Sequence, residues 1–101
     1  MARFDLYRVD SWRIPLMVDV QADILGDIAS RVVIPLRRVE QADEPPLPKL
    51  MPLLVIGDQP YLLLTTDIGA QPIRWLGKPV GNIKEHRDEI VMALDFLLQG
   101  F

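Results

Sequence analysis

The stretch LLVIGDQPYLLLTT, residues 53–66, decides the fold class, because it places two apolar runs on either side of a turn signal. The four residues 57–60 combine glycine, aspartate and proline, which favour turns, and apolar runs beside such a turn are typical of a β-hairpin. Both runs are apolar at successive positions. We therefore expect both strands to be buried on two faces, as the central strands of a sheet are.

Shorter strands are predicted on both sides of this hairpin. Apolar and polar residues alternate over residues 3–7 and 16–21, which is typical of a strand with one solvent-exposed face. Residues 31–36 are β-branched enough for a further strand, but Pro35 lacks a backbone donor and should lie at a sheet edge or a bulge. A last short strand is predicted over residues 73–76. The pattern as a whole predicts a β-rich, mainly antiparallel fold.

Two connections between these strands have unusual compositions. Residues 22–30 carry Ile24 and Leu25 outside any regular strand, so these two side chains are either satellite core or a contact surface. Residues 40–52 contain four prolines among acidic residues. Because this composition resists both helix and sheet, we expect residues 40–49 to form an exposed, partly extended loop.

The period changes to that of a helix over residues 83–98. Asn82 and Glu85 resemble a capping box, and Gly100 is placed as a C-terminal stop, so the sequence predicts one C-terminal α-helix. Residues 90–98 contain a single polar residue in nine. A helix on one sheet needs only an apolar stripe of about 100°. We therefore expect a second surface to cover this helix.

Composition bounds the class of protein. A chain of 101 residues and 11.5 kDa is expected to form a single domain over residues 1–101. The absence of cysteine excludes disulfides and thiolate sites, and the single histidine, His86, excludes His-rich metal sites. With 14 acidic and 11 basic residues the net charge is -3, and the Arg37-Arg38 pair is too short for a nucleic-acid footprint. We expect no metal, no cofactor and no direct nucleic-acid contact.

No stretch of the sequence predicts membrane association. The first residues lack an apolar signal segment, and no run approaches the roughly 20 apolar residues that span a bilayer. We therefore expect a cytoplasmic protein.

The sequence also lacks a recognisable catalytic constellation. Ser11 and Ser30 have no nucleophile signature around them, and His86 among charged neighbours fits a solvated surface histidine better than an acid or base. Trp75 lies in a predicted strand and is expected in the core or an interface. Trp12 lies in a loop and is the better candidate for a contact residue. We expect no catalytic residues, and a protein that works by binding.

Several short segments occur in an order that is specific as a set. They are VDVQADI at 18–24, RVVIPL at 31–36, IGD at 56–58, TTD at 65–67, LG at 76–77, HR at 86–87 and the terminal Gly100. This ordered set closely resembles the CcdB family of plasmid and chromosomal toxins. The resemblance implies a CcdB/MazF-like, SH3-type barrel toxin fold, with a twisted antiparallel sheet, a smaller three-stranded sheet and one C-terminal helix. It also implies a homodimer whose subunits meet near those helices.

The resemblance further implies a function without catalysis. A CcdB-like protein is the toxin of a type II toxin–antitoxin module, which binds the A subunit of DNA gyrase and poisons the topoisomerase. A CcdA-like antitoxin neutralises it by wrapping the dimer with a disordered C-terminal segment.

The same resemblance assigns contact residues to three surfaces. The residues expected to bind gyrase are Ile24, Leu25, Asp95, Leu98, Gln99, Gly100 and Phe101. Those expected to bind the antitoxin, from the loops at 8–15 and 40–50, are Arg8, Asp10, Trp12, Arg13, Asp43 and Glu44. The dimer interface is expected to include Met92, Phe96 and Leu97.

One position departs from the family pattern in a way that bears on activity. The family has a tryptophan immediately before Gly100, and this chain has Gln99. Losing such an anchor typically costs on the order of 2 kcal/mol, or about thirtyfold in affinity. Two alternatives therefore stay open: a homologue that dimerises and binds its antitoxin without poisoning gyrase, and a MazF-like endoribonuclease on the shared fold. The lone His86 and the acidic net charge give the second little support.

Overall fold

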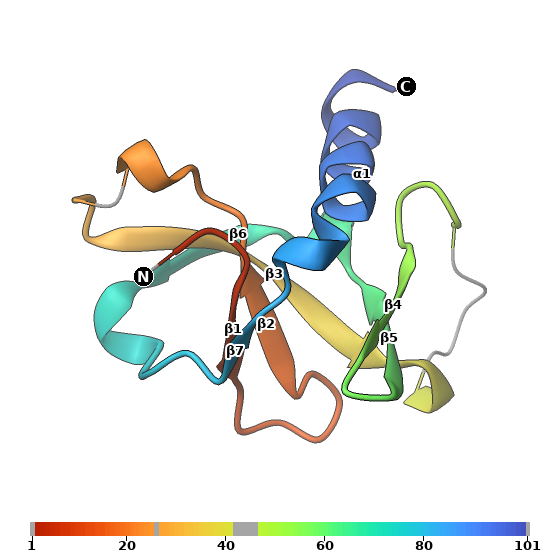
Figure 1. The fold of residues 1–101 in the computed structure, drawn as a ribbon, viewed down its shortest axis with the longest axis horizontal. Coiled ribbons are helices and arrows are strands. Elements are labelled where there is room, and N and C mark those ends of the chain that lie inside the picture. The colour runs from red at the N-terminus through yellow and green to blue at the C-terminus, as the bar shows by residue number, and fades with distance from the viewer. Residues whose placement is uncertain (1, 26, 42–46, 101) are drawn as a thin grey trace.

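The computed structural model describes residues 2–25, 27–41 and 47–100, which form an antiparallel β half-barrel with one C-terminal helix (Figure 1). The strands are β1 (Asp5–Arg8), β2 (Leu16–Asp19), β3 (Ser30–Arg38), β4 (Leu53–Ile56), β5 (Gln59–Leu63), β6 (Gly69–Pro72) and β7 (Gly81–Asn82). The helix is α1 (Arg87–Gln99), and single 3-10 turns are η1 (Asp23–Leu25), η2 (Val39–Gln41), η3 (Thr65–Asp67), η4 (Ile73–Trp75) and η5 (Lys84–His86). The predicted fold class is confirmed.

Strand β3 organises the sheet. The strand order is β4-β5-β3-β2-β1-β7, with β6 also paired to β3, and every pairing is antiparallel. On the edge away from β2, the first part of β3 pairs with β6 and its last part pairs with β5. The nine residues of β3 are long enough for both partners, so the strands form one seven-stranded sheet rather than a main sheet and a separate smaller one.

Pro35 lies within β3, an interior strand, and not at the sheet edge or bulge that was predicted. The N–H of Val20 donates to the carbonyl of Val32 at 2.9 Å, which sets the alternation of backbone bonds between β2 and β3. That alternation turns the polar backbone groups of Pro35 away from β2, toward the gap between β6 and β5. Its carbonyl accepts the N–H of Leu64 there at 2.9 Å. The missing donor therefore leaves no β2 carbonyl unpaired.

The β4–β5 hairpin closes in two residues rather than the predicted four. Gly57 has φ of 56° and Asp58 has φ of 66°, the left-handed conformation that a type I′ turn requires at both central positions. Strand β4 is also an edge strand. Leu54 is buried, but Leu53 and Val55 on the other face are about half exposed. The prediction of two central strands is therefore right for β5 and wrong for β4.

Residues 69–76 show a second difference from the prediction. No strand is predicted over residues 69–72, but β6 forms there because the open edge of β3 offers it a partner. The segment expected to be a strand contains η4, and Trp75 in it is 68% exposed rather than part of the core.

The predicted C-terminal helix forms, but it begins at Arg87 rather than at residue 83 and follows the η5 turn. The side chain of Asn82 accepts the N–H of Lys84 at 2.9 Å, just before α1, and the predicted capping box does not cap the helix, whose N-cap residue is His86. Gly100 has φ of 80°, and its N–H donates to the carbonyl of Phe96 at 2.9 Å. This left-handed residue ends the helix, as expected for a C-terminal glycine.

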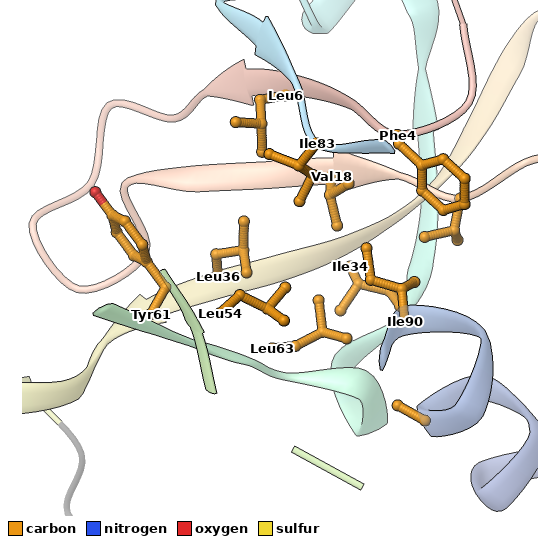
Figure 2. Packing of buried hydrophobic residues seen from close by; sticks show 12 residues of the cluster. Phe4, Leu6, Val18, Ile34, Leu36, Leu54, Tyr61, Leu63, Ile83 and Ile90 are labelled. Carbon is orange, nitrogen blue, oxygen red and sulfur yellow. The ribbon is translucent and has the colours of Figure 1, made fainter. Parts of the chain in front are cut away.

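The main core lies between α1 and one face of the sheet (Figure 2). It comprises Phe4, Leu6, Val18, Val20, Ile34, Leu36, Leu54, Tyr61, Leu63, Ile83, Ile90 and Ala93. Only the last two of these come from α1, so much of the helix's apolar surface lies outside the core. Burying each large side chain contributes about 1.5–3 kcal/mol, and the core therefore fixes the sheet and the base of the helix.

The opposite face of the sheet buries polar groups. The Nε of Arg31 donates to Oδ2 of Asp19 at 2.6 Å, and both side chains have no exposed surface. This hydrogen bond raises the pKa of the Arg31 guanidinium above its ordinary value, although burial opposes the shift. The hydroxyl of Tyr7 is also buried, without a hydrogen-bond partner among the described residues. Burial is the main cause that raises the pKa of Tyr7, and the nearby carboxylates of Asp5 and Asp19 add to it.

Replacing Tyr7 with phenylalanine is expected to raise the free energy of unfolding by about 1 kcal/mol at neutral pH, because it removes a buried hydroxyl without a partner. The folded pKa lies above the model-peptide value of 10.0. The stability linked to neutral Tyr7 is therefore complete below that value and is lost as pH rises through the folded pKa. The variant should keep this stability above about pH 10, where the wild type weakens.

Urea unfolding at neutral and alkaline pH measures both effects. Tyr61→Phe is the control, because the Tyr61 hydroxyl points toward the β1–β2 connection rather than into the far face of the sheet (Figure 2). Equal alkaline weakening of the wild type and the Tyr7→Phe variant would contradict the prediction.

Candidate protein-binding surfaces

The turn η1 presents an apolar side chain to solvent on an anchored backbone. The side chain of Ile24 is 91% exposed and that of Leu25 is 46% exposed, so these residues are not satellite core. The turn is tied down on both sides. Asp23 Oδ1 accepts the N–H of Arg3 at 2.7 Å, and the side-chain amide of Gln21 donates to the carbonyl of Leu25 at 2.9 Å. Ile24 therefore projects from a held position, which lowers the entropy cost of binding.

The C-terminal end of α1 is a second exposed surface. Leu98 is 77% exposed, and Asp95, Gln99 and Gly100 are exposed as well. Phe101 lies outside the described residues. In Figure 1, η1 (orange) and the end of α1 (blue) both stand toward the top of the view but lie apart from each other. A single chain therefore presents the expected gyrase contact as two separate patches.

The outer face of α1 borders the segment that precedes β4. Met92 is 69% exposed, while Phe96 and Leu97 are half-buried. A groove of about 520 Å³ runs between the two segments and is lined by Pro48, Lys49, Pro52, Glu89, Met92, Asp95, Phe96 and Gly100. The expected surplus of apolar helix surface is thus present on the folded chain, beside exposed residues of the proline-rich loop.

A third surface is the groove beside the connection between β1 and β2, which we call the connection groove. Its volume is about 660 Å³, and its lining is Arg8, Val9, Asp10, Ser11, Trp12, Pro15, Leu16, Arg38 and Tyr61. The Trp12 ring is 69% exposed, and the guanidinium of Arg38 lies 5.3 Å from its centroid. Arg38 Nη1 also donates to the Trp12 carbonyl at 3.5 Å. The structure therefore gathers Arg8, Asp10 and Trp12 into one site.

Other residues of the expected antitoxin surface fall elsewhere. Arg13 lines a separate, smaller hollow of about 130 Å³ with Arg37 and Asp67. Asp43 and Glu44 lie outside the described residues. Sequence reasoning missed Arg38 and Tyr61, because only the pairing of β3 with β5 sets them opposite each other.

A comparison with known protein families agrees with the resemblance that the ordered motifs indicate. The sequence matches the CcdB protein family over residues 3–100, nearly the whole chain. The chain belongs to the CcdB family. Membership suggests a toxin of a toxin–antitoxin pair and confirms the resemblance that the ordered segments indicate.

His86 has a structural place in this CcdB-family chain. Its Nδ1 lies 2.7 Å from Oε2 of Glu89, and its Nε2 lies 3.0 Å from the carbonyl oxygen of Val55. Both ring nitrogens are therefore engaged, and the ring ties η5 to the edge strand β4. An imidazole held at both nitrogens is poorly placed to exchange protons with a substrate.

Over residues 2–25, 27–41 and 47–100, no group of three or more His, Cys, Asp or Glu side chains is arranged to hold a metal ion. No helix in the same ranges is long and apolar enough to cross a bilayer.

Proposed function

We propose that this chain is the toxin of a type II toxin–antitoxin module and that it binds the A subunit of DNA gyrase. The observation that carries the proposal is Ile24, which is 91% exposed on the anchored η1 turn of a chain that belongs to the CcdB family over residues 3–100. An exposed apolar residue on a held turn fits a protein contact better than a structural role. Leu25 and four exposed residues at the end of α1 complete the proposed gyrase surface, namely Asp95, Leu98, Gln99 and Gly100.

The active form in this proposal is a homodimer. The helix uses Ile90 and Ala93 for its own core and leaves Met92 exposed and Phe96 and Leu97 half-buried. A second copy related by a two-fold axis is proposed to cover this face. In such an isologous interface the apolar patch of one subunit packs against the same patch of the other. The two-fold also doubles the proposed gyrase contacts, so that each dimer carries two copies of η1 and of the α1 end.

A protein that inhibits gyrase by binding to it needs no catalytic residue. The chain is therefore proposed to act without catalysing a reaction itself. Gyrase works on DNA inside the cell, so this target places the proposed toxin in the cytoplasm. Neutralisation is assigned to a CcdA-like antitoxin, with Arg8, Asp10 and Trp12 in the connection groove as its proposed contacts and Arg13 beside them.

A supercoiling assay with gyrase from the same host tests the proposal. Micromolar protein is expected to inhibit supercoiling and to accumulate gyrase-dependent DNA breaks. Ile24→Glu should abolish both effects without loss of stability, because the side chain is 91% exposed. Val80→Glu is the matched control, since Val80 is an exposed apolar residue outside the proposed surface.

Three outcomes separate this proposal from its alternatives. Full inhibition by the Ile24→Glu variant would remove η1 from the contact. No inhibition by the wild-type dimer would favour a homologue that binds its antitoxin only. Cleavage of single-stranded RNA in a parallel incubation would favour an endoribonuclease.

A further inference from the structure

A further groove lies beside the turn η1, and we call it the cationic groove. Its volume is about 540 Å³, and its lining includes Arg3, Asp23, Asn82, Lys84 and Arg87. Three of these side chains are cationic and one is acidic, which gives the groove a charge of +2. The whole chain carries a net charge of -3, so the groove is a local exception to the acidic character of the protein.

The three cations come from separate parts of the chain that only the fold brings together. Arg3 precedes β1, Lys84 lies in η5, and Arg87 is the first residue of α1. Arg3 and Lys84 form no ion pair with any residue that the structure describes. Arg87 Nη1 lies 3.7 Å from Oδ1 of Asp88, and both side chains are exposed. Because a surface pair of this kind contributes little, the cations remain available to a partner.

The side chain of Arg3 is held in place before a partner arrives. Its Nε donates to the carbonyl of Val20 at 3.2 Å, and its guanidinium lies 4.9 Å from the centroid of the Phe4 ring. Neither Nη group has a hydrogen-bond partner among the described residues. A guanidinium fixed at Nε offers a planar pair of donors, and this geometry matches two oxygens of a phosphate group.

The backbone that carries Arg3 is both fixed and strained. The carbonyl of Arg3 accepts Nδ2 of Asn82 at 3.0 Å, and the N–H of Phe4 donates to the carbonyl of Asp19 at 2.6 Å. Phe4 has φ of 72°, in the left-handed region that a bulky side chain rarely adopts. Its ring is buried in the core cluster (Figure 2), which keeps the residue in this conformation. Backbone strain of this kind gathers at functional sites, and here it borders the cationic groove.

The composition of the cationic groove fits a phosphate backbone better than a peptide. Its apolar members are Ala2 and Phe4, and the Phe4 ring is buried beneath Arg3. A peptide partner gains most from apolar pockets, whereas arginine and lysine bind phosphates without reading the bases. The carboxylate of Asp23 opposes an anion, but its Oδ1 is already engaged by the N–H of Arg3 at 2.7 Å. The groove therefore suits a phosphodiester chain.

We propose that the cationic groove contacts the phosphate backbone of the DNA that gyrase holds. Asp23 lines the groove, and the next residue of η1 is Ile24, so the groove adjoins the proposed gyrase surface. A chain that binds gyrase through Ile24 thus carries the three cations beside that contact. The inference rests on the proposed function, because gyrase brings the DNA to the groove. It departs from the expectation of no direct nucleic-acid contact, which was based on the net charge and the Arg37-Arg38 pair.

Fluorescence anisotropy of a labelled DNA duplex of about 20 base pairs measures the contact without gyrase, at low salt where binding to phosphates is strongest. The logarithm of the affinity should fall against the logarithm of the salt concentration with a slope of about -2 to -3, or roughly one per phosphate contact. Arg3→Gln and Lys84→Gln should each reduce this slope by about one. Lys78→Gln is the control, since Lys78 is an exposed lysine outside the groove, and it should leave the slope unchanged.

Calorimetric titrations of gyrase with and without bound DNA place the contact in the proposed complex. The wild type is expected to bind the gyrase–DNA complex about tenfold more tightly than the A subunit alone, because a second contact is then made within one assembly. Arg3→Gln and Lys84→Gln should each lose most of this gain and bind the A subunit alone as tightly as the wild type. Lys84 is exposed, so its variant gives a result even if Arg3→Gln loses stability.

The outcomes keep the two proposals apart. Equal salt slopes for the wild type and both groove variants, or equal affinity for gyrase with and without DNA, would overturn the groove proposal alone. Equal losses by the variants with and without DNA would overturn it as well, because the groove would then contact an acidic surface of gyrase itself. The expected salt slopes in a protein that does not bind gyrase would overturn the gyrase proposal alone.

Discussion

Replacing Arg31 with methionine is expected to lower the free energy of unfolding by about 3–5 kcal/mol, because it leaves the carboxylate of Asp19 buried without its partner. Neither side chain has exposed surface, so water cannot replace the lost contact. A small domain has a total stability of about 5–15 kcal/mol. The single substitution should therefore remove a large share of the protein's stability.

Urea unfolding at neutral pH measures this loss. Arg74→Met is the control, because Arg74 is exposed and its replacement should change the free energy of unfolding by no more than about 0.5 kcal/mol. The double variant Arg31→Met with Asp19→Leu should recover part of the stability, since a buried ion pair replaced by apolar groups is often close to neutral. Recovery stays incomplete because Oδ1 of Asp19 also accepts the N–H of Gln21 at 2.9 Å.

Two results would contradict the role assigned to the pair. One is a loss below about 1 kcal/mol in Arg31→Met, which is the scale of an exposed ion pair. The other is a double variant no more stable than the single variant, which would show that the volume of Arg31, and not its charge, supports the far face of the sheet.

Replacing Gln99 with tryptophan is expected to raise the affinity for the A subunit of gyrase by about thirtyfold. Gln99 is the last residue of α1 and is exposed, so a larger side chain meets no core packing. A tryptophan there supplies an aromatic surface that an amide cannot supply, and its ring can form a cation–π contact with a positively charged side chain of the partner. The variant should keep the wild-type stability, because the substitution lies on the surface.

Calorimetric titration with the gyrase A subunit, beside the supercoiling assay, measures the gain. Glu85→Trp is the control for added aromatic surface, since Glu85 is exposed in η5 before the other end of α1. Unchanged affinity in Gln99→Trp would show that position 99 lies outside the contact. An equal gain in Glu85→Trp would show nonspecific adhesion.

The hairpin at residues 53–66 shows where prediction from sequence stops. The apolar runs correctly predict two strands, but they do not say which strand has a neighbour on only one side. Strand β4 is an edge strand whose Leu53 and Val55 are half exposed, although its composition is that of a buried strand. Edge or interior position depends on pairings between distant segments, and periodicity within one segment does not contain that information.

The candidate surfaces show the same division. Ile24 lies outside any regular strand, in the connection formed by residues 22–30. The sequence therefore allowed two positions for this side chain, in a satellite core or on a contact surface, and the second is the exposed one. In the sequence, Arg38 stands out only as a member of the short basic pair Arg37-Arg38, and nothing there predicts its contact. Its contact with Trp12 exists because β3 and the β1–β2 connection meet in the folded sheet, 26 residues apart in the chain.

The sequence by itself determines several local conformations and the family of this protein. Apolar and polar residues alternate in β1 and β2, Gly57 begins the hairpin turn, Gly100 ends the helix, and the ordered motifs identify a CcdB-family chain. Only the tertiary structure decides which side chains meet: Arg31 with Asp19 in the interior, and Arg38 with Trp12 on the surface. The physical reason is that alternation tells which face a side chain occupies, whereas its neighbours on that face depend on the register between strands.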